Sequence, residues 1–145
     1  MNNELPITYR GIVYPWHCDH MGHMNVMWYA GKFDEATWGL LHLIGATSAY
    51  LKKEGKGMVA AEQRIIYKKE LLAGNLVTIS SGIIEVGEKT IKFFHEMINE
   101  ENHEIAAVTF LTGVHIDSQL RKACMMPEDL RKKAAGFVSS YQPKG

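Results

Sequence analysis

The sequence has few cysteines, few prolines, no excess of either charge and no long apolar segment. Its two cysteines, Cys18 and Cys124, are too few for the disulfide framework of a small secreted domain. Lys and Arg together number 16, as do Asp and Glu, so the basic excess of nucleic-acid-binding domains is missing. No apolar run approaches the ~20 residues that cross a bilayer, and the first residues lack the pattern of a signal peptide. These absences predict a cytoplasmic protein that binds neither nucleic acid nor membrane.

The length of the chain and the positions of its prolines indicate how the chain is organised. A chain of 145 residues fits one domain, which buries roughly two thirds of its unfolded surface and needs no metal or disulfide to hold its core. We therefore expect one domain over residues 1–145. The four prolines lie near the two ends, and none occurs between Trp16 and Met126. This absence favours long, uninterrupted helices and strands in the middle of the chain.

A strand and a long helix are predicted in the first third of the chain. Residues 7–14 are rich in strand formers, and Pro15 ends that pattern. Residues 26–44 have apolar side chains around almost the whole helical circumference, which predicts a buried helix. Gly31 and Gly39 each cost such a helix about 1 kcal/mol relative to alanine. Close approach of another backbone would offset that cost.

After Gly57 the apolar pattern changes from a helical period to the period of two that is typical of strands. It predicts a meander of four strands, over residues 58–70, 76–86, 89–99 and 104–117, followed by a short helix that begins near Pro127. Strands joined by short turns form an antiparallel sheet. The expected fold is therefore α+β, with one long helix lying across one strongly curved sheet. The edges of such a sheet favour a homo-oligomer.

Reactive side chains are concentrated in one loop. Three of the seven histidines, His17, His20 and His23, fall within seven residues, with Cys18 and Asp19 between them. The segment reads WHCDHMGHMN over residues 16–25 and directly precedes the long helix. The candidate chemistry therefore lies at the N-terminus of that helix.

This loop and the order of elements resemble the hot-dog-fold acyl-CoA thioesterases of the 4-hydroxybenzoyl-CoA thioesterase type. The family pattern is an Asp shortly before Gly-His-x-Asn, followed by an aromatic-rich helix with a Glu-Ala pair. Here the pattern appears as Asp19, then Gly22 to Asn25, then Glu35-Ala36, and the resemblance covers about residues 7–131. It implies a hot-dog fold, hydrolysis of an acyl-CoA thioester, and a homodimer or homotetramer with its active site between two protomers.

The resemblance also implies roles for residues. Asp19 would act as general base or nucleophile, and backbone N–H groups at the N-terminus of the 26–44 helix would hold the thioester carbonyl. The residues expected to contact substrate are His23, Asn25, Val26, Met27, Trp28 and Tyr29. No metal is expected, and no cofactor apart from the CoA of the substrate. Helix N-termini do offer free N–H groups and a positive dipole end, whereas Asp is a weak base unless its pKa is raised.

The same residues are also compatible with purely structural roles. Asp19 can be a turn residue, His23 can hold the loop by hydrogen bonds, and Asn25 can be the N-cap of the helix. Cys18 is expected to be a buried neighbour of the site, because a catalytic thiol needs a positioned base. Glu35 is expected to be a buried, hydrogen-bonded structural acid, and it is the second choice for the catalytic carboxylate.

Three other functions are compatible with the pattern. The histidine cluster with Cys18 and Asp19 holds zinc-ligand types, which would suit a metal-dependent hydrolase, although the loop composition argues against a shared helical face. His23 and Glu35 could serve a hot-dog dehydratase. A non-catalytic acyl-CoA binder is the third possibility.

The substrate groups are only broadly indicated by the sequence. Candidates for binding the CoA phosphates are basic residues that could equally form a solvated strand face: Arg64, Lys68, Lys69, Lys89 and Lys92. Four aromatic residues, which could line an acyl pocket or belong to the core, are Trp16, Trp28, Tyr29 and Trp38. Such rings can also hold a cationic acyl group by cation–π contact.

Overall fold

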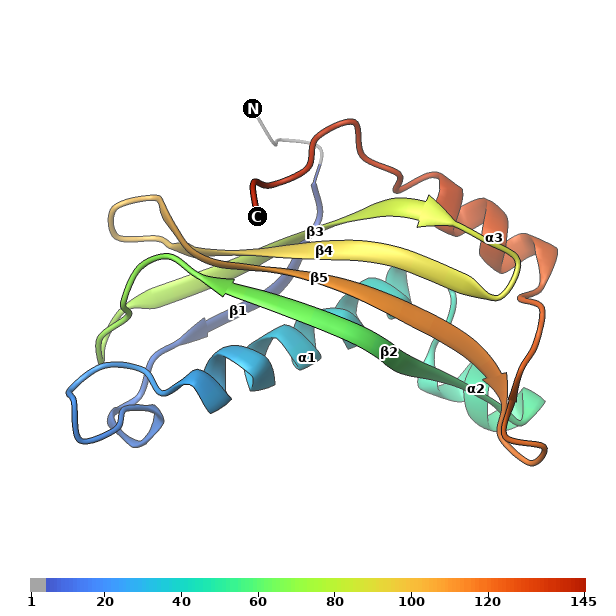
Figure 1. Cartoon of the computed structure of the whole chain (residues 1–145), viewed down its shortest axis with the longest axis horizontal. Coiled ribbons are helices and arrows are strands. Elements are labelled where there is room, and N and C mark those ends of the chain that lie inside the picture. Colours follow the sequence, from blue (N-terminus) through green and yellow to red (C-terminus); the bar gives the residue numbers. More distant parts are fainter. Residues whose placement is uncertain (1–4) are drawn as a thin grey trace.

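A computed structural model describes residues 5–145 and has an antiparallel sheet that curls around one long helix (Figure 1). The strands are β1 (Ile7–Ile12), β2 (Lys56–Tyr67), β3 (Leu76–Val86), β4 (Thr90–Asn99), β5 (Glu104–Asp117) and β6 (Lys122–Ala123). The helices are α1 (Val26–Leu43), α2 (Ser48–Glu54) and α3 (Glu128–Ala135), with a single 3₁₀ turn, η1 (Pro15–His17). The predicted α+β fold is confirmed.

The predicted meander is wrong for its first strand. The order in the sheet is β1-β3-β4-β5-β2, so β2 pairs with β5 and not with β3, which follows it along the chain. The outer edge of β3 is taken by β1, whereas β5 has a free edge along which β2 pairs from Lys56 to Tyr67. Periodicity identifies a strand but not its partner, because pairing depends on which edges the folded chain leaves open. The short elements α2 and β6 are not predicted by the sequence patterns.

Helix α1 is buried on one side only. Phe33, Ala36 and Leu40 are fully buried or nearly so, and burying side chains as large as Phe33 and Leu40 stabilises the fold by about 1.5–3 kcal/mol each. The prediction of a helix buried on all sides is wrong, because Met27 is 63% exposed and Trp38 is 44% exposed. The sheet curls over one face of α1 and leaves the other open in the single chain. No helix within the described residues is both long and apolar enough to cross a membrane.

A buried polar chain ties β1, β3, β4 and α1 together beneath the helix. His95 is fully buried, and its Nδ1 lies 2.5 Å from Ser81 Oγ while its Nε2 lies 2.8 Å from Thr37 Oγ1. Thr37 donates to the Phe33 carbonyl, so its hydroxyl accepts from the His95 ring. Ser81 then donates to Nδ1, and Thr8 Oγ1 lies 2.7 Å from Ser81 Oγ at the end of the chain. This arrangement satisfies a neutral imidazole at both nitrogens.

The two interior glycines of α1 have different surroundings. A Cβ atom on Gly39 would lie 2.6 Å from the Thr8 carbonyl oxygen, so the predicted close approach of another backbone is confirmed there. A Cβ atom on Gly31 would meet only the edge of the Trp28 ring, at 3.9 Å. Within this chain, therefore, only Gly39 is needed for packing against β1.

This contrast predicts opposite effects of the same substitution. Gly39→Ala should destabilise the fold by about 1–3 kcal/mol, because β1 must move to accept the methyl group. Gly31→Ala should stabilise it by up to about 1 kcal/mol, because alanine is the better helix former and meets no steric conflict. Urea unfolding of the two variants beside the wild type measures both changes. Equal effects of the two substitutions would contradict the packing described for Gly39.

Candidate active site

The loop before α1 is closed by its own backbone and holds Asp19 beside the start of the helix. The Asp19 N–H donates to the His23 carbonyl at 3.1 Å, and the Gly22 N–H donates to the Asp19 carbonyl at 3.0 Å. Gly22 has a φ of +89°, a conformation that side-chain-bearing residues rarely adopt, which explains why glycine stands at this turn. The Met24 N–H reaches the Leu71 carbonyl at 2.7 Å and anchors the loop to the segment after β2.

Asn25 connects the Asp19 carboxylate to the helix. Its Nδ2 donates to Asp19 Oδ2 at 3.0 Å, and its Oδ1 accepts from the Met27 N–H at 3.0 Å. The other carboxylate oxygen, Oδ1, accepts from the Met21 N–H at 2.9 Å. Asn25 is thus the N-cap of α1, as one interpretation of the sequence holds, and the same side chain orients the carboxylate at the helix N-terminus.

These hydrogen bonds determine the charge state of Asp19. The bond from Asn25, and after it the bond from the Met21 backbone, holds the pKa of the Asp19 carboxyl below its ordinary value. Asp19 is therefore ionised at neutral pH. The raised pKa that would favour a general base is not found here, because both bonds are made to the charged form.

A cavity of about 280 Å³ opens beside this carboxylate. It is lined by the loop and the first turn of α1 on one side and by the end of β2 and the segment after it on the other: Asp19, His23, Met24, Val26, Tyr29, Tyr67, Lys68, Lys69 and Glu70. The Tyr29 hydroxyl donates to the Lys69 carbonyl at 3.1 Å, and its ring packs edge-on against Tyr67. The structure therefore brings Asp19, His23, Val26 and Tyr29 together, as the sequence predicts.

The first N–H of α1, that of Val26, belongs to a residue that lines this cavity. The Met27 N–H is bound to Asn25 Oδ1 and the Trp28 N–H to the Asn25 carbonyl. None of the hydrogen bonds within residues 5–145 uses the N–H of Val26, which lines the cavity. A helix N-terminus with one unused N–H suits a carbonyl oxygen that gains negative charge.

The other residues expected to contact substrate lie outside the cavity. Met27 is exposed on the open face of α1. Trp28 packs against His17, with 4.4 Å between ring centroids. Tyr67 and Glu70 also line the cavity, although the sequence patterns did not predict them as site residues. They lie more than 40 residues after the loop and carry no local signal, since only the curl of the sheet brings the end of β2 to the helix N-terminus.

The expectation that Glu35 is a buried structural acid is wrong, because its side chain is exposed on α1. The buried charged group of that helix is Lys32, whose Nζ donates to Tyr9 Oη at 2.8 Å and to the Ile12 carbonyl at 3.3 Å. His23, which a dehydratase would pair with Glu35, instead lies 3.7 Å from Glu70. The acid and the base of that alternative are not brought together.

The three loop histidines do not converge. His17 is buried, its Nδ1 accepts from the Tyr14 N–H at 3.0 Å, and burial lowers its pKa. His20 is exposed, and His23 faces Glu70. Within the described part of the chain, no three His, Cys, Asp or Glu side chains are arranged so that they could hold a metal ion. Cys18, within the same loop, is half-buried and forms no disulfide in the described part of the chain.

The basic residues considered for the CoA phosphates are dispersed. Lys68 and Lys69 border the cavity of Asp19. Arg64 lies over the Phe110 ring and lines, together with Lys92, a separate hollow beside the C-terminal residues. Lys89 is exposed in the turn between β3 and β4. These five residues therefore do not form one binding surface.

A family model described as the thioesterase-like superfamily matches residues 13–134. The chain belongs to this superfamily. The predicted resemblance to hot-dog-fold thioesterases is confirmed, and the matched region contains the loop of Asp19, the whole of α1 and the sheet strands β2 to β6.

Solved structures and curated proteins resemble this thioesterase-like chain at low identity. A Staphylococcus aureus protein in complex with CoA superposes with a TM-score of 0.88 at 16% identity, over 97% of this chain and 90% of that one. A DHNA-CoA thioesterase, also from S. aureus, superposes with a TM-score of 0.80 at 18% identity, over 88% and 87% of the two chains. Both likenesses concern the fold alone. An L-carnitine dehydrogenase/betainyl-CoA thioesterase from Agrobacterium fabrum is 25% identical over 79% of this chain. This chain spans about a quarter of the length of the curated relatives it matches (23% and 24%).

Proposed function

We propose that this protein hydrolyses an acyl-CoA thioester to the free acid and CoA. The observation that carries the proposal is one cavity lined both by an ionised carboxylate, Asp19, and by Val26, whose N–H at the helix N-terminus is used by no hydrogen bond within residues 5–145. Thioester hydrolysis needs these two groups, because one must attack or activate water and the other must stabilise the oxyanion. Membership of the thioesterase-like superfamily supports the same reaction.

In the proposed mechanism the thioester carbonyl oxygen points at the Val26 N–H, where the dipole of α1 favours negative charge. The Asp19 carboxylate then acts on the carbonyl carbon as nucleophile, or on a water molecule as general base. The lowered pKa of Asp19 keeps the carboxylate ionised for either role, while the hydrogen bonds that lower it reduce both its basicity and its nucleophilicity. Attack forms an acyl–aspartyl anhydride and releases the CoA thiolate, and water then hydrolyses the anhydride. Asn25 and the Met21 N–H hold the carboxylate in place throughout.

The proposed acyl group is short, and it is aromatic or cationic. The cavity of about 280 Å³ is small, and it is walled by the Tyr29 and Tyr67 rings with Glu70 at its edge. Rings and a carboxylate suit a quaternary ammonium group, as in the betainyl-CoA named for the curated relatives, and the rings also suit an aromatic acyl group. We propose no metal or further cofactor, and a cytoplasmic location.

We also propose a homo-oligomer. β2 lies at the edge of the sheet, its Val59 is 44% exposed, and it runs beside the open face of α1 that carries Met27. An exposed strand edge next to exposed large apolar side chains suits pairing with a second copy of the chain. Both a dimer and a tetramer are consistent with this surface.

The proposal predicts thiol release from an acyl-CoA panel that contains betainyl-, benzoyl-, acetyl- and palmitoyl-CoA. At least one short member should be hydrolysed, at the same rate with and without EDTA, because the site needs no metal. Free CoA is measured with a thiol reagent. Binding of every thioester without release would indicate an acyl-CoA binder, and activity abolished by EDTA would indicate a metal-dependent hydrolase.

A further inference from the structure

Apart from the Asp19 cavity, a groove of about 650 Å³ lies at the opposite end of α1 from Asp19. The end of α1, helix α2 and the start of β2 enclose it, and these three elements meet at one end of the molecule (Figure 1). Its lining residues are Trp38, His42, Ala46, Thr47, Ser48, Leu51, Lys52, Gly55, Lys56 and Ser118. The proposed hydrolysis makes no use of these residues.

The groove combines positive charge with an exposed aromatic wall. Lys52 and Lys56 contribute ammonium groups, and Thr47, Ser48 and Ser118 contribute hydroxyls. No Asp or Glu is among its lining residues in the part of the chain that the structure describes. Lys56 is paired with Asp117 behind the groove, whereas the described residues give Lys52 no ion pair, so Lys52 is the lysine whose charge is open to a ligand. Trp38, 44% exposed, offers a flat surface beside the two lysines.

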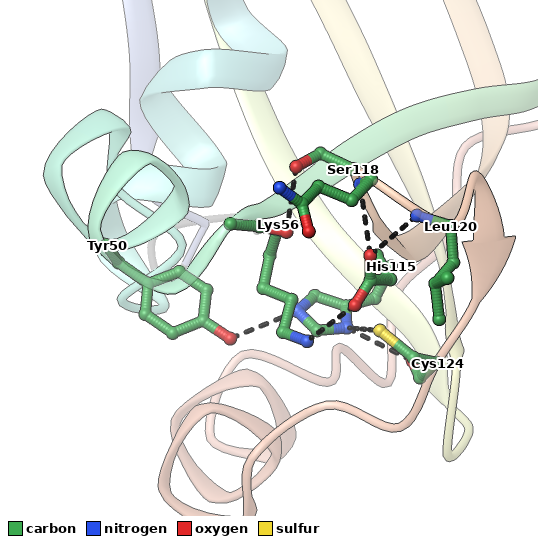
Figure 2. A network of polar contacts seen from close by, with 9 residues as sticks. Tyr50, Lys56, His115, Ser118, Leu120 and Cys124 are labelled. Atoms are coloured by element: carbon green, nitrogen blue, oxygen red, sulfur yellow. Dashed lines mark hydrogen bonds and ion pairs between the residues drawn. The ribbon is translucent and has the colours of Figure 1, made fainter.

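The walls of the groove are held in place by a polar network (Figure 2). Lys56 Nζ lies 3.4 Å from Asp117 Oδ2, and Ser118 Oγ donates to the Gly55 carbonyl at 2.8 Å. Behind them the fully buried His115 joins α2 to β5, because its Nε2 lies 3.0 Å from the Tyr50 hydroxyl. Its Nδ1 lies 3.1 Å from the Cys124 carbonyl, which adds the segment after β6. A ligand therefore meets a groove whose backbone is already positioned.

We propose that this groove binds the phosphorylated adenosine of CoA, an inference that rests on the proposed acyl-CoA substrate. CoA carries a diphosphate and a 3′-phosphate, which suit Lys52 and Lys56. Adenine has a π-face that stacks on an exposed indole such as that of Trp38. The assignment differs from the sequence-based candidates, because neither lysine of the groove is among them.

The distance between the two sites matches the length of the substrate. Trp38 lies twelve residues after Val26 along α1, which is ~18 Å at the rise of an α-helix. The phosphopantetheine arm of CoA has a backbone as long as four to five extended residues, roughly 16 Å. A third cavity between α1 and β2 shares Trp38 with the groove and adds Asp34, Thr37 and Gln63, whose polar groups suit the amides of the arm. The arm is therefore long enough to run along α1 from the groove to the helix N-terminus beside Asp19.

Two neighbouring lysines on α2 provide a matched test. Lys52 lines the groove and Lys53 does not, although both are exposed in the last turn of the same short helix. CoA is titrated into wild type, Lys52→Ala and Lys53→Ala by isothermal calorimetry. Turnover of one acyl group is then compared on CoA and on N-acetylcysteamine, a thiol that lacks the nucleotide.

We expect Lys52→Ala to weaken CoA binding about five- to tenfold. The kcat/KM on the CoA thioester, divided by the kcat/KM on the N-acetylcysteamine thioester, should fall by a similar factor. Lys53→Ala should leave both quantities at their wild-type values. Equal effects of the two variants, or no effect of Lys52→Ala on CoA binding, would overturn the groove assignment. If the wild type hydrolyses neither thioester, the proposed hydrolase fails, while the CoA titration still decides whether the groove binds the nucleotide.

Discussion

Replacing Asp19 with asparagine is expected to lower kcat about a thousandfold on any acyl-CoA that the wild-type protein hydrolyses. The carboxylate is the group proposed to attack the thioester, and an amide can neither form the anhydride nor accept a proton from water. Loss of a general base or nucleophile typically costs this much or more. Thiol release at saturating substrate, with protein concentrations high enough to detect the residual rate, measures the loss.

The substitution is designed to spare the loop. Asparagine has the shape of aspartate, and its carbonyl oxygen can still accept from the Met21 N–H, while the bond from Asn25 Nδ2 is lost because an amide nitrogen cannot accept it. Asn25 still caps α1 through its Oδ1, so the helix N-terminus should stay in place. A thermal unfolding midpoint close to that of the wild type checks this expectation.

Glu35→Gln is the matched control, because Glu35 is the second candidate acid and lies exposed on α1 outside the cavity. Its kcat should stay within about twofold of the wild-type value. If Glu35→Gln abolishes turnover while Asp19→Asn retains it, the carboxylate of the reaction has been assigned to the wrong residue.

The second large effect is the loss of stability in acid that His95 should cause. Burial lowers the pKa of His95 to about 3 in the folded state, from an ordinary value near 6.5. Below pH 6.5 the unfolded chain therefore takes up a proton that the folded chain refuses. The stabilisation is complete above pH 6.5 and is lost progressively as pH falls towards 3, at about 1.4 kcal/mol per pH unit.

Between pH 6.5 and pH 4 this one residue should lower the free energy of unfolding by about 3 kcal/mol. Urea unfolding across that pH range measures the total slope, to which other groups contribute. The contribution of His95 is isolated with His95→Gln, whose side chain cannot titrate. Between pH 6.5 and pH 4 this variant should lose about 3 kcal/mol less of its free energy of unfolding than the wild type loses. Its stability at pH 7 should be lower than that of the wild type, because glutamine cannot reproduce both bonds to Ser81 and Thr37.

His103→Gln serves as the control for this experiment. The side chain of His103 is 80% exposed, so replacing it leaves the buried imidazole of His95 in place and should leave the pH dependence unchanged. If His95→Gln and the wild type lose stability in parallel as the pH falls, a difference in the protonation of His95 between the folded and unfolded chains is excluded as the cause.

The elements of the fold could be predicted from local patterns more fully than their arrangement. Two strands, Leu76–Val86 and Glu104–Asp117, match their predicted limits, and α1 ends one residue earlier than predicted. Each is long and strongly periodic, so the signal lies within the element itself. The position of β2 beside β5 could not be predicted in this way, because the partner of a strand depends on edges that remain free only once the other strands have paired.

The candidate site likewise has one part that the sequence indicates and another part that only the fold brings together. Asp19, Gly22 and Asn25 stand within seven residues, and the turn that joins them is closed by bonds among near neighbours, so the sequence indicates the loop directly. Tyr67 and Glu70, and the groove lined by Lys52 and Lys56, depend on how the sheet curls around α1. The direction of the Asp19 pKa also required the structure, since it depends on which two donors face the carboxylate.

By itself the sequence determined the α+β class, the long helix, the reactive loop at its N-terminus and the family that this loop resembles. These features depend on residues close together in the chain, whose spacing controls local conformation. Only the tertiary structure decided which face of α1 is buried, which strands are neighbours and which distant residues complete the two cavities. These features depend on contacts between segments far apart in the sequence, and local periodicity carries no record of such contacts.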